Sequence, residues 1–206
     1  AVRWYSTDYS QHTIEQWTGG HIMMLSKKDV NSDVYNDLLE TDYLGRVYKE
    51  YSFAANTSSS DAASISKAAA KANSETTVIH HDLVELPNHN FLATVSDGSK
   101  YKEDTMIEVS HKTGKIVKVI DMKKLLPKTM WTKYAKGADG KIDWLHQNAV
   151  DYDKNDKSIV ISSRNQDMIM KLDYKTDHIK WIYSGKKKST WPKAYRPYLL
   201  KPEKGT

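Results

Sequence analysis

Three side chains that can bind an anion lie around one predicted strand in DWLHQNAVDYDKNDKSIVISSRNQ, residues 143–166. His146 and Asn148 stand before its apolar run, and Arg164 follows it. Arginine offers a planar fork of donors, asparagine an amide donor, and histidine a donor that titrates near neutral pH. Together these groups suit an oxyanion pocket. The alternative is ordinary surface chemistry, because a single histidine at a strand start is more often structural than catalytic.

This stretch belongs to a sequence unit that occurs three times in the chain, and such internal repetition indicates a repeat fold. Aligning the copies places His146 on His80 and, less securely, on His12. Asn148 falls on Asp82 in the same alignment. The recurrence of a histidine at the start of each unit favours a functional site over an isolated structural residue.

Each unit has the pattern of four strands, with a short turn before the last one at Leu44-Gly45, Thr113-Gly114 or Thr176-Asp177. Four strands per repeat indicate a β-propeller blade. We therefore predict an all-β fold of about three four-stranded propeller blades in a single partial domain, residues 1–206. The blades are expected at 12–53, 78–122 and 142–185, with short helical insertions at 54–76 and 122–141. Unrelated hairpins in a sandwich or open sheet are the alternative.

The first strand of a blade lies beside the central channel, and alternate residues of a strand share a face. His146 and Asn148 are therefore expected to point the same way, as are His80 and Asp82. Arg164 ends the following strand, which returns towards the start of the first if the two pair antiparallel. The pattern thus predicts that Arg164 lies near His146.

Composition excludes several classes of protein. The 206 residues include no cysteine, which rules out disulfides, thiol catalysis and cysteine-ligated zinc. No apolar run approaches the roughly eighteen residues of a membrane span. The net charge is +5, but the basic residues form no nucleic-acid-binding motif, so no nucleic-acid partner is predicted. Composition leaves the compartment open, and any targeting segment is expected to have been removed or never included.

No metal or cofactor is predicted. The pair His80-His81 does not form an established zinc pattern. The acidic stretch with Asp151, Asp153, Asn155 and Asp156 lacks the glycine and the distal glutamate of a calcium loop, so a solvated turn is the better interpretation.

From about Gly20 to the end, the sequence resembles the bacterial arylsulfate sulfotransferases of the PAPS-independent type. The resemblance rests on HHDLVELPNHNFL, on DWLHQNAVDYDKNDKSIVISSRNQ and on HIKWIYSG. It implies a six-bladed propeller that is extracytoplasmic, whether secreted, periplasmic or in the cell envelope. It also implies ping-pong transfer of a sulfuryl group from a phenolic sulfate ester to a phenol, through a sulfated histidine and without a cofactor.

Carried over residue by residue, the resemblance gives His146, Asn148 and Arg164 as sulfate-binding residues. His80 matches an earlier active-site histidine, with His81 in its place if the register slips. His80, His146 and Arg164 are thus the expected catalytic residues, and Asn148 and His81 the expected substrate-binding ones. The family's nucleophilic histidine belongs to a W-x-Q-H motif that this sequence lacks. The chain is therefore expected to be about half a propeller and inactive alone, and its open strand edges favour a homo-oligomer.

Two other functions compete with sulfuryl transfer. The first is a non-catalytic propeller that binds anionic ligands, such as acidic sugars or peptides, at its channel mouth. The second is a quinoprotein-like dehydrogenase, which the absence of a repeated tryptophan-docking motif disfavours. The discriminating feature is a W-x-Q-H blade beyond Thr206.

Overall fold

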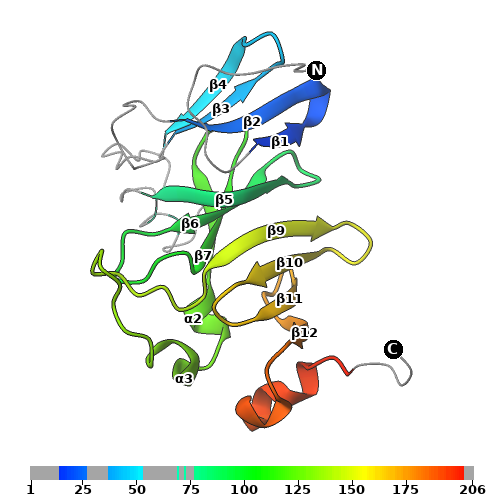
Figure 1. Cartoon of the computed structure of the whole chain (residues 1–206). Helices are drawn as coiled ribbons and strands as arrows, with labels where there is room; N and C mark the ends of the chain where they lie inside the picture. The colour runs from blue at the N-terminus through cyan, green and yellow to red at the C-terminus, as the bar shows by residue number, and fades with distance from the viewer. Residues whose placement is uncertain (1–13, 27–36, 53–68, 70–71, 73–76, 202–206) are drawn as a thin grey trace, which may run out of the picture.

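The computed structural model describes residues 14–26, 37–52, 69, 72 and 77–201, which form three antiparallel sheets of four strands each (Figure 1). In each sheet the spatial order follows the chain order. The first sheet contains β1 (Ile14–Trp17), β2 (His21–Ser26), β3 (Asp37–Thr41) and β4 (Val47–Ser52). The second contains β5 (Val78–Glu85), β6 (Phe91–Ser96), β7 (Thr105–Val109) and β8 (Ile116–Asp121). The third contains β9 (Gln147–Asp153), β10 (Ser158–Ser163), β11 (Met168–Asp173) and β12 (Ile179–Ser184).

The sheets are stacked in chain order, from the blue sheet to the orange one in Figure 1. Their first strands are neighbours in space, because β5 contacts both β1 and β9. A meander of four strands whose first strand lies beside that of the next sheet is the arrangement of propeller blades. The prediction of an all-β fold with three four-stranded blades is confirmed.

The turn before the last strand of each blade adopts the same backbone conformation. Gly45, Gly114 and Asp177 all have a positive φ, of 80°, 71° and 59°. Glycine adopts this left-handed region without steric cost, and aspartate tolerates it better than most residues do. The three turns that were aligned in the sequence are therefore equivalent in the structure.

The middle blade is buried on both faces, which explains why β6 and β7 are almost continuously apolar. Phe91, Ala93 and Ile107 pack towards the first blade, whereas Leu92 and Met106 pack towards the third. Alternate residues thus serve two different cores. The third blade has a core on one face only, and on its other face Ile169 and Tyr183 are exposed by 41% and 60%.

Adjacent blades are also joined by a repeated polar contact. Glu40 of β3 accepts a hydrogen bond from His111, which follows β7, at 2.8 Å. Glu108 of β7 accepts one from the hydroxyl of Tyr174, which follows β11. Each glutamate is cross-strand partner to a lysine of its own blade, Lys49 or Lys118.

The lysines complete this contact by reaching the next blade as well. Lys49 donates to the carbonyl oxygen of His111, and Lys118 to that of Tyr174. At the equivalent positions of the third blade stand Lys171 and Trp181, which are cross-strand partners in β11 and β12. We call the two glutamate and lysine pairs, together with the turns that they bind, the blade couplings.

Short helices occupy the connections. The segment 122–141 holds α2 (Met122–Leu125) and α3 (Lys128–Trp131), close to the single helical turn predicted there. The segment 54–76 lies outside the described residues except for Ala69 and Ala72, as does His12. After β12 the chain forms the 3-10 helices η3 (Lys188–Thr190) and η4 (Lys193–Tyr198). Among the described residues, none of the helices has the length and apolar character to cross a membrane.

Candidate active site

The first strand of the middle blade contains an irregularity at the predicted histidines. Ile79 pairs with Val95 and Leu83 with Ala93, so the three residues 80–82 stand opposite Thr94 alone. The buried Thr94 hydroxyl donates to the carbonyl oxygen of His80 and accepts the backbone N–H of Asp82 at 3.2 Å. We call residues 80–82 the β5 bulge.

The β5 bulge changes which way its side chains point. His81 has a φ of 56°, in the left-handed region that non-glycine residues seldom adopt. The alternation that would place His80 and Asp82 on one face therefore does not apply. The ring nitrogens of His80 are buried, whereas Asp82 accepts the backbone N–H of Val150 in the third blade at 2.9 Å.

The third blade has a related irregularity. His146 lies just before β9 with a φ of 52°, and the pairing of β9 with β10 shifts opposite Asn148. His146 is half-buried, Gln147 is buried and Asn148 is exposed, and the common orientation of His146 and Asn148 remains a prediction. The predicted neighbourhood of Arg164 is confirmed, because its backbone N–H donates to the carbonyl oxygen of His146 at 3.0 Å.

Three histidine rings from the two blades lie next to one another. The ring centroids of His80 and His81 are 5.1 Å apart, and those of His81 and His146 are 5.2 Å apart. Glu103, which precedes β7, lies between the two blades: its Oε2 is 3.6 Å from His81 Nε2 and 2.8 Å from His146 Nδ1. Glu103 also has a positive φ, of 56°.

Asp143 is the second carboxylate at the site. Its Oδ2 forms a hydrogen bond of 2.6 Å with His146 Nδ1. A carboxylate on Nδ1 favours the tautomer that carries its proton there, which leaves Nε2 as an acceptor. Asp143 thus fixes both the orientation and the tautomer of the His146 ring.

Burial and neighbouring charges set the ionisation of these groups. Burial lowers the pKa of His80 to about 3, so this imidazole is neutral at neutral pH. Burial opposes ionisation of Glu103, but the hydrogen bond with His81 and the electrostatic interactions with the neighbouring histidines outweigh it and lower the pKa of Glu103. The cluster therefore presents an ionised carboxylate beside a neutral, desolvated imidazole.

Arg164 and Asn148 adjoin the cluster through His146: the backbone of Arg164 is bound to that of His146, and Asn148 stands two residues after it. Both residues are exposed, and neither side chain has a hydrogen bond or ion pair within the described part of the chain. The backbone beneath them is held by Gln166, whose buried amide donates to the Trp144 carbonyl oxygen at 2.6 Å and accepts from Lys186 at 2.8 Å. Two donors on a fixed frame are thus free to bind an anion beside His146.

The structure brings the rings of His80, His81 and His146 together, joins the backbone of Arg164 to that of His146, and places Asn148 two residues after His146 in β9. Two carboxylates at this cluster, Glu103 and Asp143, were missed by the sequence reasoning. Asp143 stands three residues before His146, and that spacing was the available signal. Glu103 had no comparable signal, because it comes from a different unit and acts through its position beside the β5 bulge. Donor atoms of His80, His81 and Glu103, and likewise of Glu103, Asp143 and His146, lie within 4.8 Å of one another.

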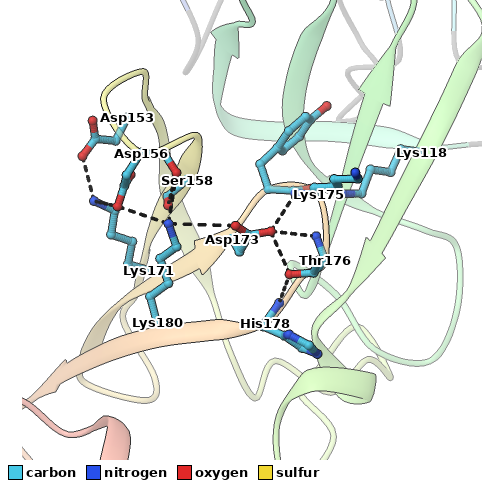
Figure 2. Close-up of polar contacts among 11 residues, drawn as sticks. Lys118, Asp153, Asp156, Ser158, Lys171, Asp173, Lys175, Thr176, His178 and Lys180 are labelled. Carbon is cyan, nitrogen blue, oxygen red and sulfur yellow. Dashed lines mark hydrogen bonds and ion pairs between the residues drawn. The ribbon is translucent and has the colours of Figure 1, made fainter.

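The acidic turn between β9 and β10 binds the protein's own lysines (Figure 2). Lys171 Nζ lies 2.7 Å from Asp153 Oδ2 and 3.0 Å from Asp156 Oδ2. Lys180 Nζ lies 3.2 Å from Asp156 Oδ2. These carboxylates are therefore neutralised by ion pairs on the blade surface.

The similarity to solved structures is weak. A protein of unknown function from Bacteroides caccae has a TM-score of 0.49 and 8% identity, covering 84% of this chain and 46% of that one. BamB from Moraxella catarrhalis has a TM-score of 0.44 and 12% identity, covering 89% and 44%. Glutaminyl cyclase from Myxococcus xanthus has a TM-score of 0.44 and 14% identity, covering 76% and 53%. The chain thus spans about half the length of these proteins.

No curated protein matches this sequence. The arylsulfotransferase (ASST) family model matches it over residues 1–206, the whole of its length. The match covers the three blades and every residue of the histidine cluster. The chain belongs to the arylsulfotransferase (ASST) family.

Proposed function

We propose that this chain supplies part of the sulfate-binding pocket of an enzyme that transfers a sulfuryl group from a phenolic sulfate ester to a phenol through a sulfohistidine. His146, Arg164 and Asn148 bind the sulfuryl oxygens from the third blade. His80 and His81 form the opposite wall from the middle blade. Family membership supports the reaction class, and the geometry supports the division of roles.

One observation carries the proposal: the backbone of Arg164 is bound to that of His146, while the arginine side chain is left exposed and unpaired within the described residues. An arginine with no structural partner is available for a ligand. Its planar fork of N–H groups matches two oxygens of a sulfuryl group at once. The Asn148 amide adds a neutral donor on the same side of the cluster.

During the reaction negative charge develops on the sulfuryl oxygens, which Arg164 and Asn148 are proposed to bind. A nucleophilic imidazole nitrogen attacks sulfur, the bond from sulfur to the phenolic oxygen breaks, and the phenolate leaves with that electron pair. As the bond loosens, charge spreads over the non-bridging oxygens, which Arg164 and Asn148 stabilise. In the second step the oxygen of the acceptor phenol attacks the sulfur of the sulfated histidine and its proton passes to His146 Nε2. The bond between sulfur and the imidazole nitrogen breaks, which restores the free imidazole.

His146 acts on the leaving group in this scheme. Asp143 holds Nδ1, so Nε2 exchanges a proton with the phenolic oxygen. The attacking histidine is expected in a W-x-Q-H blade that this sequence does not contain. The complete enzyme is proposed to be extracytoplasmic, to use a small phenolic sulfate ester as donor and a small phenol as acceptor, and to need no cofactor for the transfer.

The test uses the complete parent protein and a chromogenic aryl sulfate, with phenol as the acceptor. Arg164→Ala is expected to lower kcat by about a hundredfold or more, as loss of a charge-stabilising donor does in other acyl- and phosphoryl-transfer sites. Arg164→Lys is expected to restore only part of kcat, because lysine cannot form the two parallel hydrogen bonds. His178→Ala, on the exposed turn before β12, serves as the control with unchanged activity.

The same assay separates the proposal from simple anion binding. Aryl sulfate that binds without any release of phenol in the parent would favour a non-catalytic propeller. Transfer that survives both His80→Ala and His146→Ala would refute the site assignment. The isolated 206-residue chain is expected to bind phenyl sulfate and to release no phenol.

A further inference from the structure

A second kind of site is contained in the histidine cluster. His80 and His81 lie in the β5 bulge, and Glu103 precedes β7. One donor atom from each of these three residues lies within 4.8 Å of the other two. All three residues are at least partly buried, so their arrangement does not result from acidic groups gathered on an exposed surface.

Part of this donor set has no partner in the protein. Both ring nitrogens of His80 are buried and form no hydrogen bond of normal geometry with the described residues, and Glu103 Oε2 is buried beside the imidazoles of His81 and His146. Buried polar atoms without a partner are costly, and in native proteins they ordinarily bind a water molecule, a ligand or an ion. The unpaired nitrogens of His80 therefore point to a bound group that completes the cluster.

A second cluster of the same residue types shows the contrast. Glu40 also lies between two histidines, but its Oε1 is 2.6 Å from His21 Nδ1 and its Oε2 is 2.8 Å from His111 Nε2. Each imidazole there has its own carboxylate oxygen, and no ring nitrogen of His21 or His111 is a buried atom without a partner. Residue composition is thus the same in the two clusters, and only the arrangement around Glu103 leaves nitrogens without partners.

The backbone keeps the donors around Glu103 in place. His81 and Glu103 both have a φ of 56°, a conformation that is unfavourable for these residues and that clusters at functional sites. The Thr94 hydroxyl holds the carbonyl of His80 and the N–H of Asp82 on either side of His81. The β5 bulge and the segment before β7 thereby bring the side chains of His80, His81 and Glu103 close together.

We propose that His80, His81 and Glu103 bind one divalent transition-metal ion, of which Zn²⁺ is the best match. Two imidazoles and a carboxylate form a ligand set that zinc accepts, with a further coordination position for water or substrate. Asp143 and His146 lie against the same Glu103 carboxylate, so the metal site adjoins the pocket proposed for the sulfuryl group. The inference does not rest on that function, because ion binding is measured without substrate.

The experiment titrates tag-free, chelator-stripped protein with ZnCl₂ in a calorimeter and counts bound zinc by mass spectrometry. One zinc per chain is expected. His80→Ala and Glu103→Gln are each expected to weaken binding by more than about tenfold, the loss seen even for residues that only support a ligand. Glu40→Gln and His111→Ala, in the satisfied cluster, are the matched controls and should leave zinc binding unchanged.

Co²⁺ absorption gives a second measurement that does not depend on a buried variant folding. The wild-type chain is expected to develop a visible band with one equivalent of Co²⁺, and His81→Ala, at a half-buried position, to lose it. Failure of the wild type to bind either ion at one equivalent would overturn the proposal. So would zinc binding that persists in both His81→Ala and Glu103→Gln, or that disappears equally in the two control variants.

Discussion

Asp82 joins two blades: its Oδ2 accepts the backbone N–H of Val150 at 2.9 Å, across 68 positions of sequence. The contact connects the β5 bulge with β9, and hence the two halves of the candidate site. Asp82→Ala is expected to lower the free energy of unfolding by about 1.5–3 kcal/mol, as for a hydrogen bond to a charged group. Asp82→Asn keeps one acceptor oxygen and should cost less. Equal losses for the two variants in urea denaturation would mean that the acceptor is not what matters.

Thr94 is expected to hold the backbone of the β5 bulge in its observed conformation. Thr94→Val preserves shape but removes the hydroxyl that binds His80 and Asp82, and leaves a buried carbonyl without its donor. We expect a loss of about 1–3 kcal/mol in the free energy of unfolding. Thr94→Ser keeps the hydroxyl and is the control. The ring NMR signals of His80 and His81 should move in the valine variant and stay in place in the serine variant.

Substitution of Arg164 is expected to weaken ligand binding with little effect on the free energy of unfolding. Its exposed guanidinium has no partner within the described residues, so Arg164→Ala is expected to change the free energy of unfolding by less than about 0.5 kcal/mol. Affinity of the isolated chain for phenyl sulfate should fall by about tenfold or more, because a charged hydrogen bond is lost. Calorimetric titration and thermal denaturation measure the two quantities on one sample. A large drop in stability with unchanged affinity would assign Arg164 a structural role.

The acidic turn predicts a specific pH dependence. The hydrogen bond from Lys171, supported by Ser158 and Lys180, lowers the pKa of Asp156 to about 2 from its ordinary 3.8. Because the folded value lies below the unfolded one, the stabilisation is complete above about pH 3.8 and is lost as the pH falls to about 2. The difference in melting temperature between wild type and Asp156→Asn should therefore be constant near neutral pH and vanish by about pH 2. Salt should reduce it, since the pair is exposed.

Repetition within the sequence was sufficient to predict the blades. The three turns at Gly45, Gly114 and Asp177 could be aligned because each needs a residue that tolerates a left-handed backbone. The proximity of Arg164 to His146 followed from antiparallel pairing alone. These features depend on local pattern, which a single sequence contains.

The orientation of the site residues could not be predicted in this way. Strand alternation fails wherever extra residues enter one strand, and nothing in HHD signals that His81 adopts a positive φ. Glu103 reaches His146 only because the middle and third blades are stacked, so its role depends on the packing of distant segments. The histidines could therefore be proposed as site residues from the sequence, but the carboxylates beside them, Glu103 and Asp143, could not.

The blade couplings run from the first blade to the second and from the second to the third. The two ends of the stack are therefore not equivalent. Glu40 with Lys49 meets the turn after β7, and Glu108 with Lys118 meets the turn after β11. A gene duplication that repeated the middle blade would place Glu108 and Lys118 against a second copy of the turn that contains His111. In the first coupling a glutamate and a lysine already bind this turn. Repeating the third blade would instead bring Lys171 and Trp181 to that position. The array can thus lengthen by copying of the middle blade without new contacts having to evolve, whereas copying of the third blade requires them.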